Sequence, residues 1–147
     1  MTFRAMKKLL TVLLLTVTLF SANVDEFAAE MGFERDYKTA LAKAKAENKP
    51  LMMVLGADYC PWCRKFERKT LSSKLIKPKL DKSVVTLIVD KKFDVKSFPK
   101  EFQTQLTPRV FFIDPKDGKS FYETVGYVKR KEYLIDLENM LNLYGKK

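Results

Sequence analysis

A continuous apolar run, Leu-Met-Met-Val-Leu at residues 51–55, constrains the fold more than any other feature of the sequence. A strand with one face in water alternates apolar and polar side chains, whereas a run without alternation indicates a strand that is covered on both faces. Such strands lie in the centre of sheets that carry helices on both sides. A second strongly apolar run, at residues 84–89, has the same character. The two runs therefore predict an α/β fold.

Further helices and strands are expected to alternate with these two strands. Apolar residues at helical spacing predict the helices, and short apolar runs predict the strands. The expected helices span 37 to about 48, 62 to about 73, 97–105 and 133–144, with a break at Pro78. The expected later strands span 110–113 and 121–125. The short Asp-Pro-Lys-Asp-Gly turn between these strands predicts an antiparallel hairpin.

The first 22 residues differ from the rest of the chain. Three basic residues precede an apolar run from Leu9 to Phe20, and Ser21-Ala22 follows with small side chains. This layout is typical of a secretory signal peptide, so we expect residues 1–22 to be removed and the protein to be periplasmic or otherwise exported. A retained membrane anchor stays open as an alternative, because Phe20 is bulky where signal cleavage prefers a small side chain.

Cleavage after residue 22 would leave about 125 residues, enough for one core. Residues 23–34 are expected to be an N-terminal lead-in, and residues 35–147 to form a single domain. This part keeps 25 basic and 18 acidic residues, a net charge of +7. Its lysines are scattered among acidic residues rather than gathered in a dense run, which argues against nucleic-acid binding. The chain has no histidine, so it lacks the commonest metal ligand and the usual general base.

The chain has two cysteines, in the motif Cys60-Pro61-Trp62-Cys63 shortly after the first strand. A disulfide across two intervening residues closes a very small loop and therefore adds little stability. The spacing suits reversible exchange, because one thiolate attacks a substrate disulfide and the second thiol resolves the mixed disulfide within the same molecule. We therefore expect thiol-disulfide oxidoreductase chemistry. The cysteine pair would be its redox group, with no separate cofactor and no metal.

Pro61 suits the first turn of a helix, which places Cys60 at the helix N-terminus. Unpaired backbone N–H groups and the helix dipole stabilise a thiolate at that position. Cys63 lies one turn deeper in the same helix and is expected to be more buried. We therefore assign Cys60 as the nucleophile and Cys63 as the resolving residue.

From about residue 35 to residue 144 the chain resembles the thioredoxin superfamily. The resemblance rests on the strand before the Cys-Pro-Trp-Cys motif, on Thr107-Pro108, on the hairpin that contains Gly126 and on the closing helix. The segment from Tyr37 and the Glu-Asn-Lys-Pro sequence before the first strand are most similar to exported thioredoxin-related proteins of bacteria. The resemblance implies a thioredoxin-like fold, in which helices flank a central mixed β-sheet.

The resemblance also implies substrate-binding positions and partners. Thr107 and Pro108 are expected to face the cysteines, with a cis peptide bond before Pro108, and to bind an extended substrate chain. Pro61 and Trp62 flank the nucleophile and are expected to contact the substrate. Tyr59 either offers further apolar area or packs against the domain. The implied partners are disulfides of exported proteins or peptides and a membrane protein that delivers electrons.

The sequence departs from thioredoxin at two places. Val54 replaces the buried acid six residues before the first cysteine, and Pro-Trp replaces Gly-Pro between the cysteines. The proton acceptor for the resolving thiol is therefore open. Asp58 is the nearest acidic candidate in sequence, and a solvated aspartate is its other interpretation. Arg64 and Arg109 are candidates for lowering the pKa of the nucleophile, although solvated surface arginines are the favoured interpretation.

The redox direction is also open. We favour a reductase or isomerase over a disulfide-forming oxidase, because Trp62 stands where strong exported oxidants carry a histidine. A dimeric metal-binding or cluster-binding protein is an alternative that needs two chains, since one chain supplies two thiolates and no histidine. A redox-inert interaction domain is a third alternative, and the intact cysteine pair argues against it. The protein is expected to be a monomer.

Overall fold

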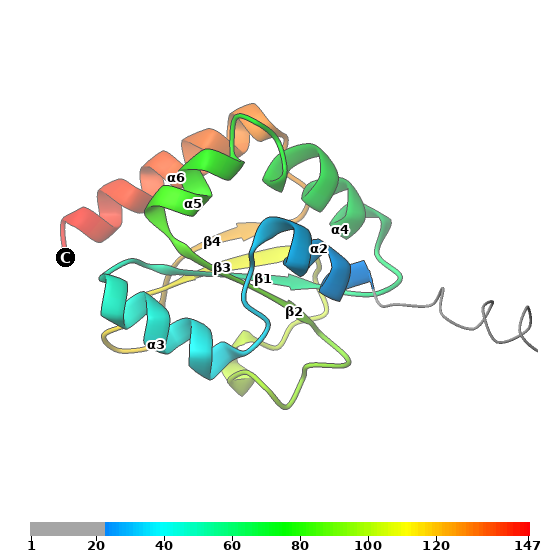
Figure 1. Ribbon diagram of the computed structural model, residues 1–147, viewed down its shortest axis with the longest axis horizontal. Helices are drawn as coiled ribbons and strands as arrows, with labels where there is room; N and C mark the ends of the chain where they lie inside the picture. Colours follow the sequence, from blue (N-terminus) through cyan, green and yellow to red (C-terminus); the bar gives the residue numbers. More distant parts are fainter. Residues whose placement is uncertain (1–22) are drawn as a thin grey trace, which may run out of the picture.

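The computed structural model describes residues 23–147, so the predicted signal peptide at 1–22 lies outside the described residues. Four strands form one mixed sheet in the order β2-β1-β3-β4 (Figure 1). The strands are β1 (Leu51–Gly56), β2 (Val85–Asp90), β3 (Arg109–Ile113) and β4 (Ser120–Val125). β1 runs parallel to β2 and antiparallel to β3, and β3 and β4 form the expected antiparallel hairpin.

Helices cover both faces of this sheet, which confirms the predicted fold class (Figure 1). One face carries α2, α4, α5 and α6, and the other carries α3. The α-helices are α2 (Asn23–Met31), α3 (Tyr37–Glu47), α4 (Pro61–Phe66), α5 (Lys77–Ser83) and α6 (Arg130–Gly145). The π-helical turn η1 (Glu67–Leu71) continues α4, and a 3₁₀ turn, η2 (Lys100–Phe102), precedes β3.

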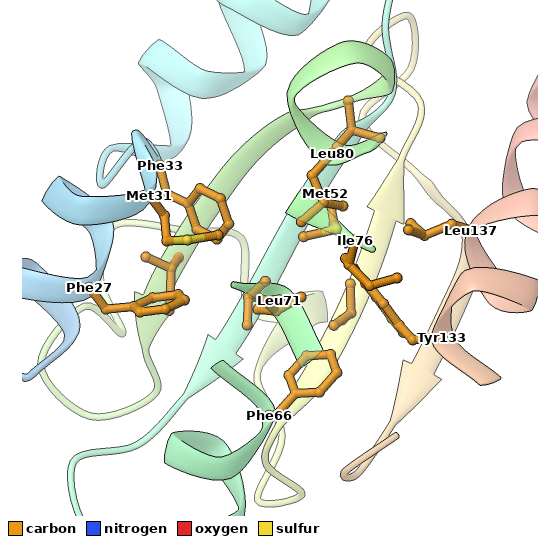
Figure 2. Packing of buried hydrophobic residues seen from close by; sticks show 14 of the residues in the cluster. Phe27, Met31, Phe33, Met52, Phe66, Leu71, Ile76, Leu80, Tyr133 and Leu137 are labelled. Atoms are coloured by element: carbon orange, nitrogen blue, oxygen red, sulfur yellow. Dashed lines mark hydrogen bonds between the residues drawn. The ribbon is translucent and has the colours of Figure 1, made fainter. Parts of the chain in front are cut away.

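The two hydrophobic cores meet at β1, whose six residues are all buried. Met52 and Val54 face the larger core, while Met53 and Leu55 face the core beneath α3. Figure 2 shows side chains of the larger core converging from the helices onto the sheet. Those labelled from the helical side include Phe27, Met31, Phe66, Leu71, Ile76, Leu80, Tyr133 and Leu137. The apolar run therefore forms the doubly covered strand that its pattern predicts.

Residues 23–34 are part of the folded domain rather than a simple lead-in. α2 buries its apolar face in the larger core, where the Phe27 ring meets Phe33 edge-on with centroids 5.7 Å apart. The Glu34 N–H then donates to the Thr86 carbonyl over 2.8 Å at the outer edge of β2. The sequence predicts no element here, because a helix of nine residues depends on its tertiary packing rather than on a long periodic pattern.

The structure differs from the prediction at two further places. Pro78 lies in the first turn of α5, where its missing N–H is tolerated, so it begins a helix instead of breaking the chain. The segment 97–105 contains only the three-residue η2. Phe98 and Phe102 are buried in the core beneath α3, so packing of these two rings, rather than helical hydrogen bonding, places this segment.

Phe27→Ala tests whether α2 belongs to the cooperative fold. We expect the free energy of unfolding to fall by about 3 kcal/mol, because a buried ring and its packing contacts are lost. Urea denaturation of the protein beginning at residue 23 provides the measurement. Phe93→Ala is the matched control, since its ring is 65% exposed and its removal should change stability by less than about 0.5 kcal/mol. Equal effects of the two substitutions would show that α2 is not part of the core.

Candidate active site

Cys60 and Cys63 form a disulfide where the chain leaves β1 and enters α4. Cys60 is the N-cap of α4, and its Sγ accepts a hydrogen bond from the Cys63 N–H over 3.1 Å. Pro61 occupies the first turn, where its missing N–H leaves no bond unmade. Cys60 is 9% exposed and Cys63 is 1% exposed. The first sulfur is therefore the one nearer to solvent, as the sequence predicts.

Thr107 reaches the same place from a distant part of the chain. Its hydroxyl Oγ1 lies 3.5 Å from Cys60 Sγ and is placed to donate to it. The peptide bond between Thr107 and Pro108 is cis, as the family resemblance implies. The Pro108 carbonyl accepts a hydrogen bond from the Gly126 N–H over 2.8 Å, which ties this segment to the end of β4.

Two aromatic side chains stand out beside the disulfide. Tyr59 is 99% exposed and Trp62 is 57% exposed. The Trp62 ring packs against Tyr127, with centroids 5.7 Å apart, and Lys65 Nζ lies 5.0 Å and 4.8 Å from the centroids of these two rings. Cation–π attraction and ring packing thus hold Trp62 in place while leaving much of its surface free.

A groove of about 450 Å³ opens beside Cys60. It is lined by the turn after β1, including Asp58 and Tyr59, by Pro61 and Trp62 at the start of α4, and by the turn after β2. Thr107, from the segment before β3, also lines this groove. The groove therefore brings together Cys60, Pro61, Trp62 and Thr107, four of the residues singled out from the sequence.

Arg64 is largely buried, in contrast to the solvated arginine favoured from the sequence. Its side chain is 19% exposed, and Nη2 is 2.7 Å from Glu67 Oε1. A methyl group at Gly56 would lie 3.8 Å from Arg64 Nη2 and 3.9 Å from Cys63 Sγ, so the guanidinium and the buried sulfur border one small space at the end of β1. Arg64 thus lies behind the disulfide, next to the buried Cys63 sulfur rather than in the lining of the groove beside Cys60.

Glu67 is a site residue that the sequence interpretation missed. It is 3% exposed, and burial raises the pKa of its carboxyl, although the Arg64 guanidinium pulls this pKa in the opposite direction. A sequence signal existed, because Glu67 follows Cys63 and Phe66 at helical spacing. In the structure all three side chains, and Thr70 one turn further on, are buried. An acid on the apolar face of the helix that carries the resolving cysteine indicates a buried carboxyl close to the site.

α2 lies across a small hollow from this ion pair. The hollow has a volume of about 220 Å³ and is lined by Glu26, Phe27 and Glu30 on one side and by Arg64 and Glu67 on the other. Figure 1 shows α2 beside α4 on the same face of the sheet. The N-terminal helix thus forms one wall of the space beside the ion pair.

The remaining candidate tuning residues lie apart from this pair. Arg109 Nε is 3.1 Å from Glu123 Oε2, a bond that joins β3 to β4 and neutralises the guanidinium charge. Asp58 is half-buried and lines the groove beside Cys60. Of the three charged residues singled out as tuning candidates, Asp58 borders the nucleophile's groove and Arg64 borders the resolving sulfur.

The thioredoxin-like domain family model matches residues 37–141. The chain belongs to the thioredoxin-like domain family. Together with the disulfide at Cys60 and Cys63, this membership supports thiol-disulfide oxidoreductase activity. The matched range contains both cysteines, Thr107 and Pro108, whereas α2 precedes it.

Two curated relatives of this thioredoxin-like chain are matched over shorter stretches. The thiol:disulfide interchange protein DsbD of Cronobacter sakazakii is 39% identical over 71 residues, which cover 45% of this chain and 12% of that protein. The anterior gradient protein 2 homolog of Homo sapiens is 32% identical over 79 residues, which cover 54% of this chain and 43% of that protein. The chain thus spans less than half the length of each.

Solved structures show the same fold at low sequence identity. A thioredoxin from Thermus thermophilus superposes with a TM-score of 0.65 at 23% identity, covering 74% of this chain and 85% of that chain. The oxidised DsbD C-terminal domain of Neisseria meningitidis superposes with a TM-score of 0.57 at 24% identity, covering 73% of this chain and 97% of that chain.

Within residues 23–147, no group of three or more Cys, Asp or Glu side chains is placed to hold a metal ion. Over the same residues, every helix is too short or too polar to cross a membrane.

Glu67→Gln tests the raised pKa of the buried carboxyl. The folded state binds this proton more tightly than the unfolded state does. The stability linked to it is therefore fully present below the unfolded pKa and is lost as the pH rises through the folded pKa. From pH 4 to pH 7, wild-type stability should fall relative to that of the Gln variant in urea unfolding.

Asp36→Asn is the control with the opposite sign. The Thr39 backbone N–H lowers the pKa of Asp36, so the stability linked to Asp36 is present above its unfolded pKa and is lost as the pH falls. Wild-type stability should therefore rise with pH relative to that of the Asn variant. Two variants with the same trend would contradict the assignment of Glu67.

Proposed function

We propose that the protein is an exported thiol-disulfide oxidoreductase that reduces or isomerises disulfide bonds of exported proteins or peptides. The observation that carries this proposal is the Cys60–Cys63 disulfide beside an open groove, with the Thr107 hydroxyl 3.5 Å from the outer sulfur. The matched stretch of a thiol:disulfide interchange protein supports the same class of reaction. The periplasmic location rests on the signal-like residues 1–22.

The first step uses the reduced protein. The Cys60 thiolate attacks one sulfur of the substrate disulfide, a Cys60–substrate disulfide forms, and the other substrate sulfur leaves as a thiolate that takes a proton from water. The Cys63 N–H and the Thr107 hydroxyl both point hydrogen-bond donors at Cys60 Sγ, and donors to the charged form favour the thiolate. The substrate sulfur that leaves is the one that is reduced in this step.

Resolution follows within the same molecule. Cys63 loses its proton, attacks Cys60 Sγ and releases the second substrate sulfur as a thiolate, which is then protonated. Two electrons have passed to the substrate, and Cys60–Cys63 is again a disulfide. A dithiol on an electron-donor protein, which we place in the membrane, regenerates the reduced pair by the reverse exchange. The protein acts as a monomer in this scheme.

Two carboxylates are candidates for receiving the Cys63 proton. Asp58 lines the groove on the Cys60 side, and Glu67 is buried on the same helix face as Cys63. A raised pKa makes a carboxylate a stronger base, which favours Glu67. Arg64 holds Glu67 in place through their 2.7 Å contact, so we treat Arg64 as its positioning residue.

Groups around the groove supply substrate contacts in this proposal. Pro61 and Trp62 offer apolar surface next to the attacking sulfur, and the Thr107-Pro108 backbone borders an extended substrate chain. Trp62 in place of a histidine removes one source of thiolate stabilisation, which favours reduction or isomerisation over oxidation.

Cysteine variants test which sulfur attacks the substrate and which resolves the mixed disulfide. Cys63→Ala should accumulate mixed disulfides with substrate through Cys60, because the resolving thiol is gone. Cys60→Ala should trap none, and both should lose disulfide reductase activity by about 100-fold or more. Non-reducing gels followed by mass spectrometry identify the trapped cysteine. Trapping through Cys63 in the Cys60→Ala protein would reverse the assignment of nucleophile.

The reduction potential of the pair tests the redox direction. We expect a value more negative than about −180 mV, on the reducing side of protein disulfide isomerase, because no histidine stabilises the reduced thiolate. Equilibration with glutathione buffers followed by alkylation gives this value. A potential near about −120 mV, typical of a strong exported oxidant, would favour the oxidase alternative instead.

A further inference from the structure

A second hollow shares two of its lining residues with the groove beside Cys60. This second hollow has a volume of about 680 Å³ and is lined by Lys91, Lys92, Val95, Gln103, Thr104 and Gln105. Lys91 and Lys92 also line the groove beside Cys60, so the two spaces meet at the lysine pair. A polypeptide whose disulfide reaches Cys60 can therefore extend over both lysines.

The two spaces differ in character. The groove beside Cys60 carries three largely exposed aromatic side chains, Tyr59, Trp62 and Phe93, which offer apolar contact area. Its lining also includes Asp58 and Asp90. The second hollow is lined by two lysines and no carboxylate. An anionic side chain is therefore favoured in the second hollow rather than directly at the sulfur.

The positive charge of this region is not neutralised by neighbouring acids. Residues 91–100 include four lysines and one acid, Asp94. Asp94 is already ion-paired with Arg35 over 2.9 Å and also accepts the Asp90 N–H over 2.7 Å. Within residues 23–147, none of these four lysines lies within ion-pair distance of a carboxylate. The segment after β2 is therefore a basic surface that is available to a partner.

Lys91 is oriented by the opposite wall of the second hollow. Its Nζ donates to the Gln105 backbone carbonyl over 3.4 Å and to the Gln105 side-chain oxygen over 3.3 Å. These bonds join the turn after β2 to the segment before Thr107. They hold one ammonium group at the boundary of the two spaces before a ligand arrives, which lowers the entropy cost of using it.

We propose that the protein selects disulfide-bearing polypeptides that carry acidic residues a short distance from the reactive cysteine. The acidic residues bind Lys91 and Lys92 over the second hollow, while side chains next to the cysteine contact Tyr59, Trp62 and Phe93. This substrate class rests on the proposed function, since it assumes that the groove beside Cys60 receives a substrate disulfide. Complementary charge would raise the rate of encounter and fix the direction in which the substrate lies.

Peptide reduction tests the charge preference. Three disulfide-bonded peptides would differ only in flanking Glu, Gln or Lys residues. Wild-type kcat/KM should be about fivefold higher for the Glu peptide than for the Gln peptide at low ionic strength, and lowest for the Lys peptide. The preference should appear mainly in KM and shrink at high salt.

Charge-matched variants locate the preference. The double variant Lys91→Gln, Lys92→Gln should lower the ratio of kcat/KM for the Glu peptide to that for the Gln peptide to below about twofold. The control Lys116→Gln, Lys119→Gln removes two exposed lysines from the β3–β4 turn and should keep the wild-type ratio. Equal kcat/KM values for all peptides, or equal loss of preference in both variants, would overturn the proposal while leaving the proposed function intact.

A binding measurement without chemistry separates the two claims. Trp62 is the only tryptophan of the chain and lines the groove, so its fluorescence reports occupancy. Peptides with serine in place of cysteine should bind with the same Glu-over-Gln preference, and the Lys91, Lys92 double variant should lose it. Charge-selective binding without reduction of any disulfide peptide would support the acidic-ligand site and overturn the proposed reductase function. Binding without charge preference would overturn the acidic-ligand site.

Discussion

Burial of β1 on both faces is the constraint on which the rest of the structure depends. Helices cover each side of β1, and at its C-terminal end the chain turns into α4, which places the Cys60–Cys63 disulfide at that end of the sheet. β3 runs antiparallel beside β1, with Arg109 opposite Leu55. Thr107 lies two residues before Arg109, so it must reach the same end of the sheet. Strand pairing brings together groups that are 47 residues apart in sequence.

The polar side chains behind the disulfide, Arg64 and Glu67, are not explained by their contribution to stability. A buried ion pair such as Arg64–Glu67 adds little stability compared with apolar side chains of the same size, because both charges must leave water. Its location near the resolving sulfur fits the proposed role of Glu67 as proton acceptor, with Arg64 as its positioning residue. Val54 occupies the position where thioredoxin has a buried acid, and the chain supplies a buried carboxyl from the next helix.

Strong local patterns made the framework of the site predictable from sequence. The unbroken apolar run indicated a central strand, and Pro61 after Cys60 indicated a helix start. Thr107-Pro108 came from family resemblance, because nothing in its local pattern indicates that it lies near Cys60. α2 escaped prediction because its stability comes from Phe27 and its neighbours packing onto a distant sheet. Tertiary contacts also decided the burial of Arg64 and Glu67, since long polar side chains on a short helix usually indicate a solvated face.

α2 brings the N-terminal end of the described chain next to the buried ion pair near the disulfide. The family match begins at residue 37, so the common thioredoxin-like frame does not include this helix. Here, α2 lines the hollow next to Arg64 and Glu67 with Glu26, Phe27 and Glu30. Separating α2 from the domain would expose Glu67 further and bring the pKa of its carboxyl closer to its ordinary value. A segment that contributes no reacting atom thus forms part of the surroundings of the buried ion pair.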